Sequence, residues 1–161
     1  MKSLVVYDSQ YGNTKKVAET IAGVLAQRGS CLAVHVAEVQ PGDLAGIDTL
    51  VVGSPTQQLS ATGGIKSWLD GLPAGSLNGV RGAAFDTRFT QQKIDEIKIL
   101  AFFVSIFGYG AKPIARRLAK KGAQIIAEPV GFYVADTEGP LLDQELERAG
   151  AWAAALETGS L

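Results

Sequence analysis

Short runs of β-branched and other apolar residues alternate along the chain with longer segments whose apolar residues recur at helical spacing. This alternation is typical of a parallel sheet, because parallel neighbouring strands need a crossover, usually a helix, between them. The run at 49–53 (TLVVG) is almost wholly apolar, as expected of a strand that helices cover on both faces. The pattern predicts strands at 3–7, 33–36, 49–53 and 82–85, and a fifth strand in two pieces, 124–126 and 131–134.

Helices are expected between these strands, at 13–28, 65–71 and 113–121, and after the last strand, at 140–156. Gly29 follows the first of them, and Gly122 follows the third, which has Pro113 in its first turn. Five strands with intervening helices predict a doubly wound α/β fold, with strand order 2-1-3-4-5 and helices on both faces. The length of 161 residues suits one domain over 1–161.

Composition excludes several classes of partner and site. The formal net charge is −1, so no nucleic-acid or anionic-membrane partner is expected. The longest apolar-rich run, 97–107, is too short for a membrane helix of roughly 20 residues. Cys31 and His35 are the only residues of their kinds, so neither an internal disulfide nor a metal cluster built on them is expected. The first residues lack signal-peptide features, and a cytoplasmic protein is expected.

The loop after the first strand is the best candidate for ligand binding. In folds of this strand order, ligands bind beyond the carboxyl ends of the strands, between the first and third strands. The loop offers hydroxyls, an amide, a glycine that permits a tight turn, and the start of a helix that favours an anion. Its residues are Ser9, Gln10, Tyr11, Gly12, Asn13 and Thr14. They predict a phosphate site, with simple capping of the helix as the alternative.

Other phosphate motifs are absent from this loop. It contains no lysine and no Gly-Lys-Ser/Thr sequence, which argues against a nucleoside triphosphate site. The glycine spacing also differs from a dinucleotide-binding fingerprint. A phosphorylated receiver domain needs clustered carboxylates after the first and third strands, but the third strand leads into Ser54. No serine has a plausible catalytic triad, and no catalytic residue is expected.

The same loop resembles the phosphate-binding loop of flavodoxins, which has a Ser/Thr-x-Thr-Gly-x-Thr pattern. Tyr11 stands where many members of that family have threonine. The segment 51–56, followed by the Trp-Leu-Asp sequence at Trp68, is also similar to the family's flavin loop and the helix after it. The resemblance implies a protein that binds FMN and passes electrons to a redox partner protein or a small-molecule acceptor.

The resemblance also implies which residues contact the flavin ring. On one side they are Pro55, Thr56, Gln57, Gln58 and Leu59, and on the other Asp86, Thr87, Arg88 and Phe89, with Asp86 acting through its backbone. Residues 54–64 contain no aromatic to stack on the ring, unlike many flavodoxins. A cation at Arg88 would stabilise reduced flavin and raise its potential, and a surface ion pair is the alternative role. For residues 55–59, the alternative is a loop that only connects two elements.

Three interpretations of function stay open. An FMN-binding electron-transfer protein is preferred over a substrate-specific oxidoreductase. The alternatives are an NAD(P)H-dependent FMN quinone reductase and a flavodoxin-fold interaction module without flavin. Residues 97–109 hold more apolar side chains than one helix face needs, so they predict a packed helix, a homodimer surface or a cover over the flavin. The basic run at 116–121 is interpreted as a solvated helix face.

Overall fold

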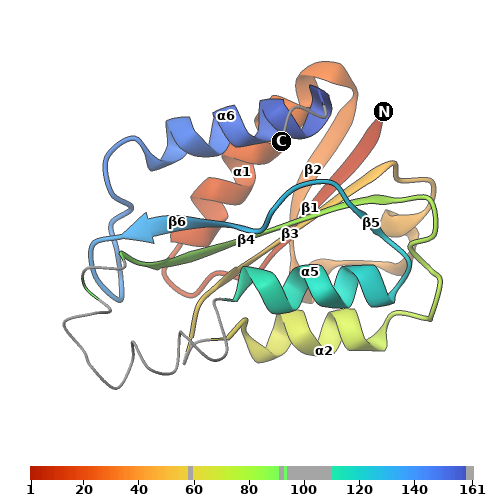
Figure 1. Ribbon diagram of the computed structural model, residues 1–161, viewed down its shortest axis with the longest axis horizontal. Coiled ribbons are helices and arrows are strands. Elements are labelled where there is room, and N and C mark those ends of the chain that lie inside the picture. Colours follow the sequence, from red (N-terminus) through yellow and green to blue (C-terminus); the bar gives the residue numbers. More distant parts are fainter. Residues whose placement is uncertain (58–59, 91–92, 94–109, 159–161) are drawn as a thin grey trace.

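The computed structural model describes residues 1–57, 60–90, 93 and 110–158 (Figure 1). In this part of the chain a parallel sheet has the strand order β2-β1-β3-β4-β5, and β6 also pairs with β4. The strands are β1 (Lys2–Tyr7), β2 (Ser30–His35), β3 (Thr49–Pro55), β4 (Arg81–Phe89), β5 (Gln124–Ile125) and β6 (Val130–Val134). The predicted doubly wound order is therefore confirmed, including the interrupted last strand.

Helices cover both faces of the sheet (Figure 1). Those described are α1 (Asn13–Leu25), α2 (Gly63–Gly71), α5 (Ala111–Lys120) and α6 (Glu145–Thr158), with short 3-10 turns at η1 (Ala26–Arg28), η2 (Val36–Glu38) and η3 (Pro41–Leu44). α1 and α6 pack on one face, and α2 and α5 pack on the other. No described helix is both long enough and apolar enough to cross a bilayer.

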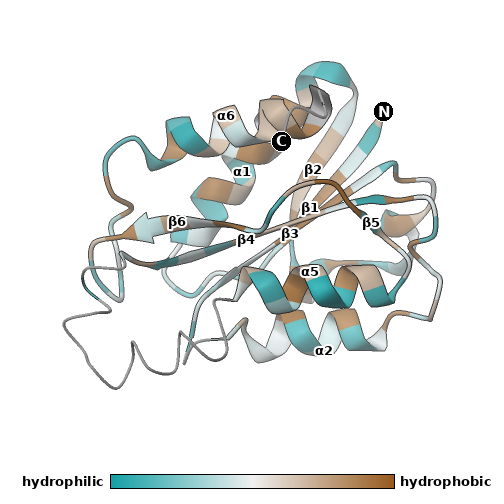
Figure 2. Ribbon diagram, in the orientation of Figure 1, coloured by the Kyte–Doolittle hydropathy of each residue, from teal (hydrophilic) through white to brown (hydrophobic). Residues whose placement is uncertain are grey.

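Alternating side chains of the strands supply two separate cores. On β1, Leu4 and Val6 face α2 and α5, whereas Val5 faces α1 and α6. Each helix buries the apolar side that its sequence repeats at helical spacing. Figure 2 shows hydrophobic and hydrophilic residues alternating along α5, whose Ile114 and Leu118 are buried. Since both faces are covered, the central strands are nearly continuous apolar runs.

The fourth strand is longer than the sequence pattern predicted. The expected strand ended at Phe85, but β4 continues through Phe89. Its added residues pair with β6, from Phe85 beside Val130 to Phe89 beside Val134. Polar residues such as Asp86 are unfavourable in strands, so the local pattern hid this extension. Residues 86–89, which were expected to follow the strand, therefore form its carboxyl end.

The closing helix also begins later than predicted. Its expected start at residue 140 was wrong, because the chain first pairs with β6 again. The N–H of Ala135 donates to the carbonyl of Pro140, and the N–H of Leu142 donates to that of Tyr133. α6 then begins at Glu145, whose carboxylate accepts the N–H of Tyr133 at 2.8 Å.

Two buried hydroxyls allow a stability prediction. Ser3 and Thr49 are neighbours in register on β1 and β3, and their hydroxyls have no hydrogen-bond partner among the described residues. A buried polar group without a partner costs roughly 1–3 kcal/mol. We therefore expect Thr49→Val, which preserves the shape, to raise the free energy of unfolding by about 1 kcal/mol in urea titration. Thr87→Val is the matched control, and it should lower stability because the Thr87 hydroxyl is hydrogen-bonded. Equal effects of the two changes would contradict this account.

Candidate functional site

A cavity of about 700 Å³ opens where β1, β3 and β4 end. Its position matches the point where the strand order reverses, and its size lies within the range of small-molecule sites. The wall contains Ser9, Gln10, Tyr11, Asn13, Thr14, Pro55, Thr56, Gln57, Ser60, Ala61, Thr62, Gly63, Lys66, Thr87, Arg88, Phe89, Val134 and Thr137. Three connections distant in sequence therefore share one cavity.

Most of the predicted site residues lie in this wall. Gly12 and Asp86 do not, and Gln58 and Leu59 lie outside the described residues, as do the interpretations of 97–109. Sequence reasoning missed the start of α2, including Thr62 and Lys66. It also missed the residues after β6 and the last residue of that strand. The rule that ligands meet the carboxyl ends of strands could have indicated Val134 and Thr137.

The first loop has the backbone of an anion site. Gly12 adopts φ 87°, in the left-handed region that favours glycine, directly before α1. The Ser9 hydroxyl accepts the N–H groups of Gly12 at 3.1 Å and of Lys15 at 3.3 Å. Ser9 therefore caps the start of α1, as the alternative interpretation held. A helix start has several N–H groups without partners inside the helix, and together they favour a bound anion, so capping by Ser9 and anion binding are compatible.

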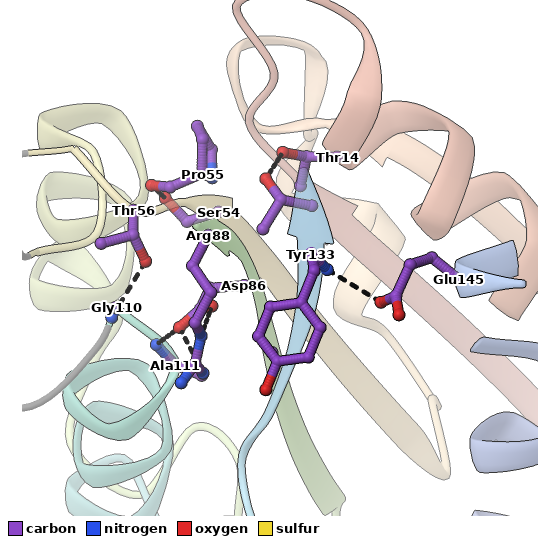
Figure 3. A network of polar contacts seen from close by, with 12 residues as sticks. Thr14, Ser54, Pro55, Thr56, Asp86, Arg88, Gly110, Ala111, Tyr133 and Glu145 are labelled. Carbon is purple, nitrogen blue, oxygen red and sulfur yellow. Dashed lines mark hydrogen bonds and ion pairs between the residues drawn. The ribbon is translucent and has the colours of Figure 1, made fainter. Parts of the chain in front are cut away.

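Hydrogen bonds join the first loop to the other two. The hydroxyls of Thr14 and Thr87 lie 2.8 Å apart, both buried, and link α1 to β4 (Figure 3). The side-chain amide nitrogen of Gln57 donates to the side-chain oxygen of Gln10, Oε1, at 2.6 Å. The loop after β3 thus contacts the first loop through the Gln57 side chain, and β4 contacts the start of α1 through the Thr87 side chain. These contacts hold the three parts of the cavity wall to one another.

A second cluster holds the start of α2 beside the first loop. The Thr62 hydroxyl donates to Asp8 at 2.6 Å and accepts the N–H of Ile65 as the cap of α2. His35 contacts the other Asp8 oxygen at 3.2 Å, and its Nδ1 accepts the N–H of Ala37. His35 is therefore half-buried beside a carboxylate partner that the sequence did not indicate. Among the described residues no group of three His, Cys, Asp or Glu could hold a metal.

Asp86 organises the floor beside the cavity (Figure 3). Its carboxylate is fully buried, forms an ion pair with Arg88 and accepts the N–H of Ala111 at 2.7 Å. Thr56 accepts the N–H of Gly110 at 3.3 Å, so β4, the loop after β3 and the start of α5 are joined. Burial raises the pKa of the Asp86 carboxyl above its ordinary value, while Arg88 acts in the opposite direction. Asp86 is absent from the residues that line the cavity, and its expected backbone contact with the flavin stays a prediction.

The charge expected at Arg88 is balanced. Its guanidinium lies against Asp86 and over the backbone of Gly131, where a Cβ would approach the Arg88 Nε to 2.0 Å. The ion-pair alternative is therefore the one present, although the acid is buried rather than on the surface. The other charged residue of the wall is Lys66, whose ammonium donates to the Ser60 hydroxyl at 3.3 Å. No carboxylate in the described ranges forms an ion pair with Lys66.

Comparison with known proteins identifies the family to which the chain belongs. The model of the Flavodoxin domain matches residues 4–96. A flavodoxin of Aquifex aeolicus is 30% identical over an alignment of 114 positions, covering 68% of this chain and 62% of the relative. An NAD(P)H dehydrogenase (quinone) of Nitrobacter winogradskyi is 28% identical over 181 positions, covering 93% of this chain and 91% of the relative.

Solved structures share the fold. A flavodoxin from the domain Archaea covers 100% of both chains with a TM-score of 0.76 at 22% identity. Flavodoxin 1 of Bacillus cereus covers 98% of both chains with a TM-score of 0.73 at 17% identity. The strand order and the match over more than half of the sequence agree with these likenesses. The chain therefore belongs to the flavodoxin family of redox flavoproteins.

Proposed function

We propose that the cavity binds FMN and that the chain transfers electrons through it. The phosphate would lie at Ser9–Thr14, and the ring between the loop after β3 and the carboxyl end of β4. The observation that carries the proposal is the single cavity shared by the three predicted segments. The wall fits an anionic ligand, since its residues include one cation without an ion-pair partner, Lys66, and no carboxylate within the part that the structure describes.

The chain's own residues would bind and orient the cofactor. FMN, when bound, supplies the redox chemistry, while the protein sets its potential and access. N–H groups at the start of α1 would hold the phosphate, with the hydroxyls of Ser9 and Thr14 close by. The Asp86–Arg88 pair would keep Thr87 and Phe89 in place on β4. The Gln10–Gln57 contact would fix the spacing between the phosphate and ring ends of the site.

Affinity for two flavins tests the phosphate assignment. Riboflavin has the same ring as FMN but no phosphate, so only FMN can use the first loop. We expect fluorescence titration to give at least 100-fold tighter binding of FMN. Equal affinity for both flavins would refute the phosphate site while leaving a ring site.

A cytoplasmic location is part of this proposal.

A second candidate function is an NAD(P)H-dependent quinone reductase. It is favoured by relatives with that name, one of which aligns over 93% of this chain. Hydride transfer would require the nicotinamide to reach an open face of the ring. Mixing the FMN-loaded protein with NADH or NADPH in a stopped-flow instrument separates the candidates. Loss of flavin absorbance within seconds supports the reductase, and an unchanged spectrum supports the electron carrier.

Lys66 is expected to influence the flavin potential. A positive charge in the wall favours negatively charged reduced flavin, by about 1 kcal/mol for charges several Å apart in a wet site, or about 40 mV for one electron. We therefore expect Lys66→Gln to lower the midpoint potential by about this amount in a spectroelectrochemical titration. Lys66→Arg should restore it, and Lys120→Gln should leave it unchanged. A potential that is equal in all variants would contradict a role for Lys66.

A further inference from the structure

Charge is unevenly distributed between the two helical layers. Segments 63–71 and 111–121, the α2/α5 layer, contain six basic residues and one acidic residue. The whole chain has 15 basic and 16 acidic residues, so the remainder has 9 basic and 15 acidic residues. The basic residues of this layer are Lys66, Lys112, Arg116, Arg117, Lys120 and Lys121. A nearly neutral chain thus carries a distinctly positive face.

Some of these cations support the fold. Arg117 pairs with Asp70 at 3.0 Å, and Lys121 donates to the Asp70 carbonyl at 2.8 Å and to that of Leu72. These contacts connect α5 and the residue after it to α2. Asp70, the one acidic residue of the layer, is thus paired. So is part of the basic run at 116–121, which was interpreted from the sequence as a solvated helix face.

Three other cations form a stripe that takes no part in the ion pairs among the described residues. Lys112, Arg116 and Lys120 are exposed and recur every four residues, so they share one side of α5, away from buried Ile114 and Leu118. No ion pair joins them to a carboxylate within the described ranges. Like charges at this spacing slightly destabilise a helix. We call these three residues the cationic stripe.

The cationic stripe begins beside the cavity. The residues just before Lys112 are bound to the site: the N–H of Gly110 donates to Thr56 in the wall, and that of Ala111 donates to Asp86 (Figure 3). α2 runs next to α5 (Figure 1). It adds Lys66 to the same wall. A partner seated on the stripe would therefore lie next to the cavity opening.

We propose that the cationic stripe is the docking face for an acidic electron-transfer protein. The proposal rests on the proposed function, and the transferred species is one electron, which leaves the partner's metal centre and enters the flavin without bond formation. Complementary charge steers such encounters and orients them. A long polyanion fits less well, because three cations neutralise few phosphates and the segments outside the α2/α5 layer contain more acidic than basic residues.

Salt-dependent electron transfer tests this docking face. The probe is a reduced plant-type [2Fe–2S] ferredoxin, an acidic and strongly reducing protein, mixed with the FMN-loaded full chain in a stopped-flow instrument. For the native chain, we expect the second-order rate constant to fall as ionic strength rises. Lys112→Gln/Arg116→Gln should be at least fivefold slower at low salt and equal to the native chain at high salt.

A matched variant separates the stripe from total charge. Lys2→Gln/Arg28→Gln removes two cations at the opposite end of the sheet and should leave the ferredoxin rate within twofold of native. Equal slowing by both variants, or no slowing by the stripe variant, overturns the proposal. Binding of a single-stranded oligonucleotide or of phosphatidylserine vesicles that is lost only in the stripe variant, with an unchanged ferredoxin rate, also overturns it. Absorbance of the loaded protein is recorded first, so that failure to hold FMN is recognised as failure of the proposed function itself.

Discussion

Asp86→Asn is expected to lower the free energy of unfolding by about 3–5 kcal/mol, because it leaves the Arg88 charge buried without its partner. The Asp86 carboxylate is fully buried and the Arg88 side chain is 13% exposed, so water cannot replace the lost contact. The change also weakens the acceptor of the Ala111 N–H at the start of α5. Urea unfolding followed by circular dichroism at pH 8 measures the effect.

Two controls separate a buried ion pair from a general loss of charge. Asp70→Asn breaks the exposed pair with Arg117 and should cost less than about 1 kcal/mol. The double variant Asp86→Leu/Arg88→Met removes both charges and should regain most of the lost stability. If Asp86→Asn costs no more than Asp70→Asn, the pair does not hold the site floor as described.

Ser9→Asp is expected to weaken FMN binding by about 100-fold or more. The new carboxylate would accept the N–H groups that Ser9 now accepts from Gly12 and Lys15, and it would repel the flavin phosphate. Two like charges about 4 Å apart near a protein surface repel by about 4 kcal/mol, which exceeds a 100-fold change in affinity. Fluorescence titration with FMN measures the loss.

The matched control for this change is Ser9→Asn, which has the shape of aspartate without its charge. It should bind FMN within about tenfold of the native chain, since it removes a hydrogen bond and adds no repulsion. Riboflavin affinity should be nearly equal in all three proteins because riboflavin has no phosphate. A similar loss of affinity for FMN and for riboflavin in Ser9→Asp would show that the substitution disrupts the structure of the loop instead of repelling the phosphate.

The sheet order was predictable because hydrophobic period and strand position are local properties of the sequence. Apolar runs identified the central strands, and glycines marked the ends of helices. The extension of β4 through Asp86 to Phe89 was not predictable, because it depends on pairing with β6 some 45 residues later in the chain. The late start of α6 has a similar cause, since residues near Pro140 pair with β6 first.

The site was predictable where residues lie directly after a strand. The first loop follows β1, and Thr56 and Gln57 follow β3, whose last residue is Pro55. The family resemblance predicted their role. The partner of Arg88 was not predictable, because the sequence does not show that Asp86, two positions earlier, lies against it in the interior. Lys66 was missed because it lies on a helix, a full turn beyond the loop, and reaches the wall through its long side chain.

The absorbance spectrum of the purified chain, after incubation with excess FMN and desalting, tests the FMN site most directly. We expect retained flavin bands corresponding to about one FMN per chain, and their loss in Ser9→Asp but not in Ser9→Asn. A colourless native protein would contradict the claim that the cavity at the ends of β1, β3 and β4 is an FMN site.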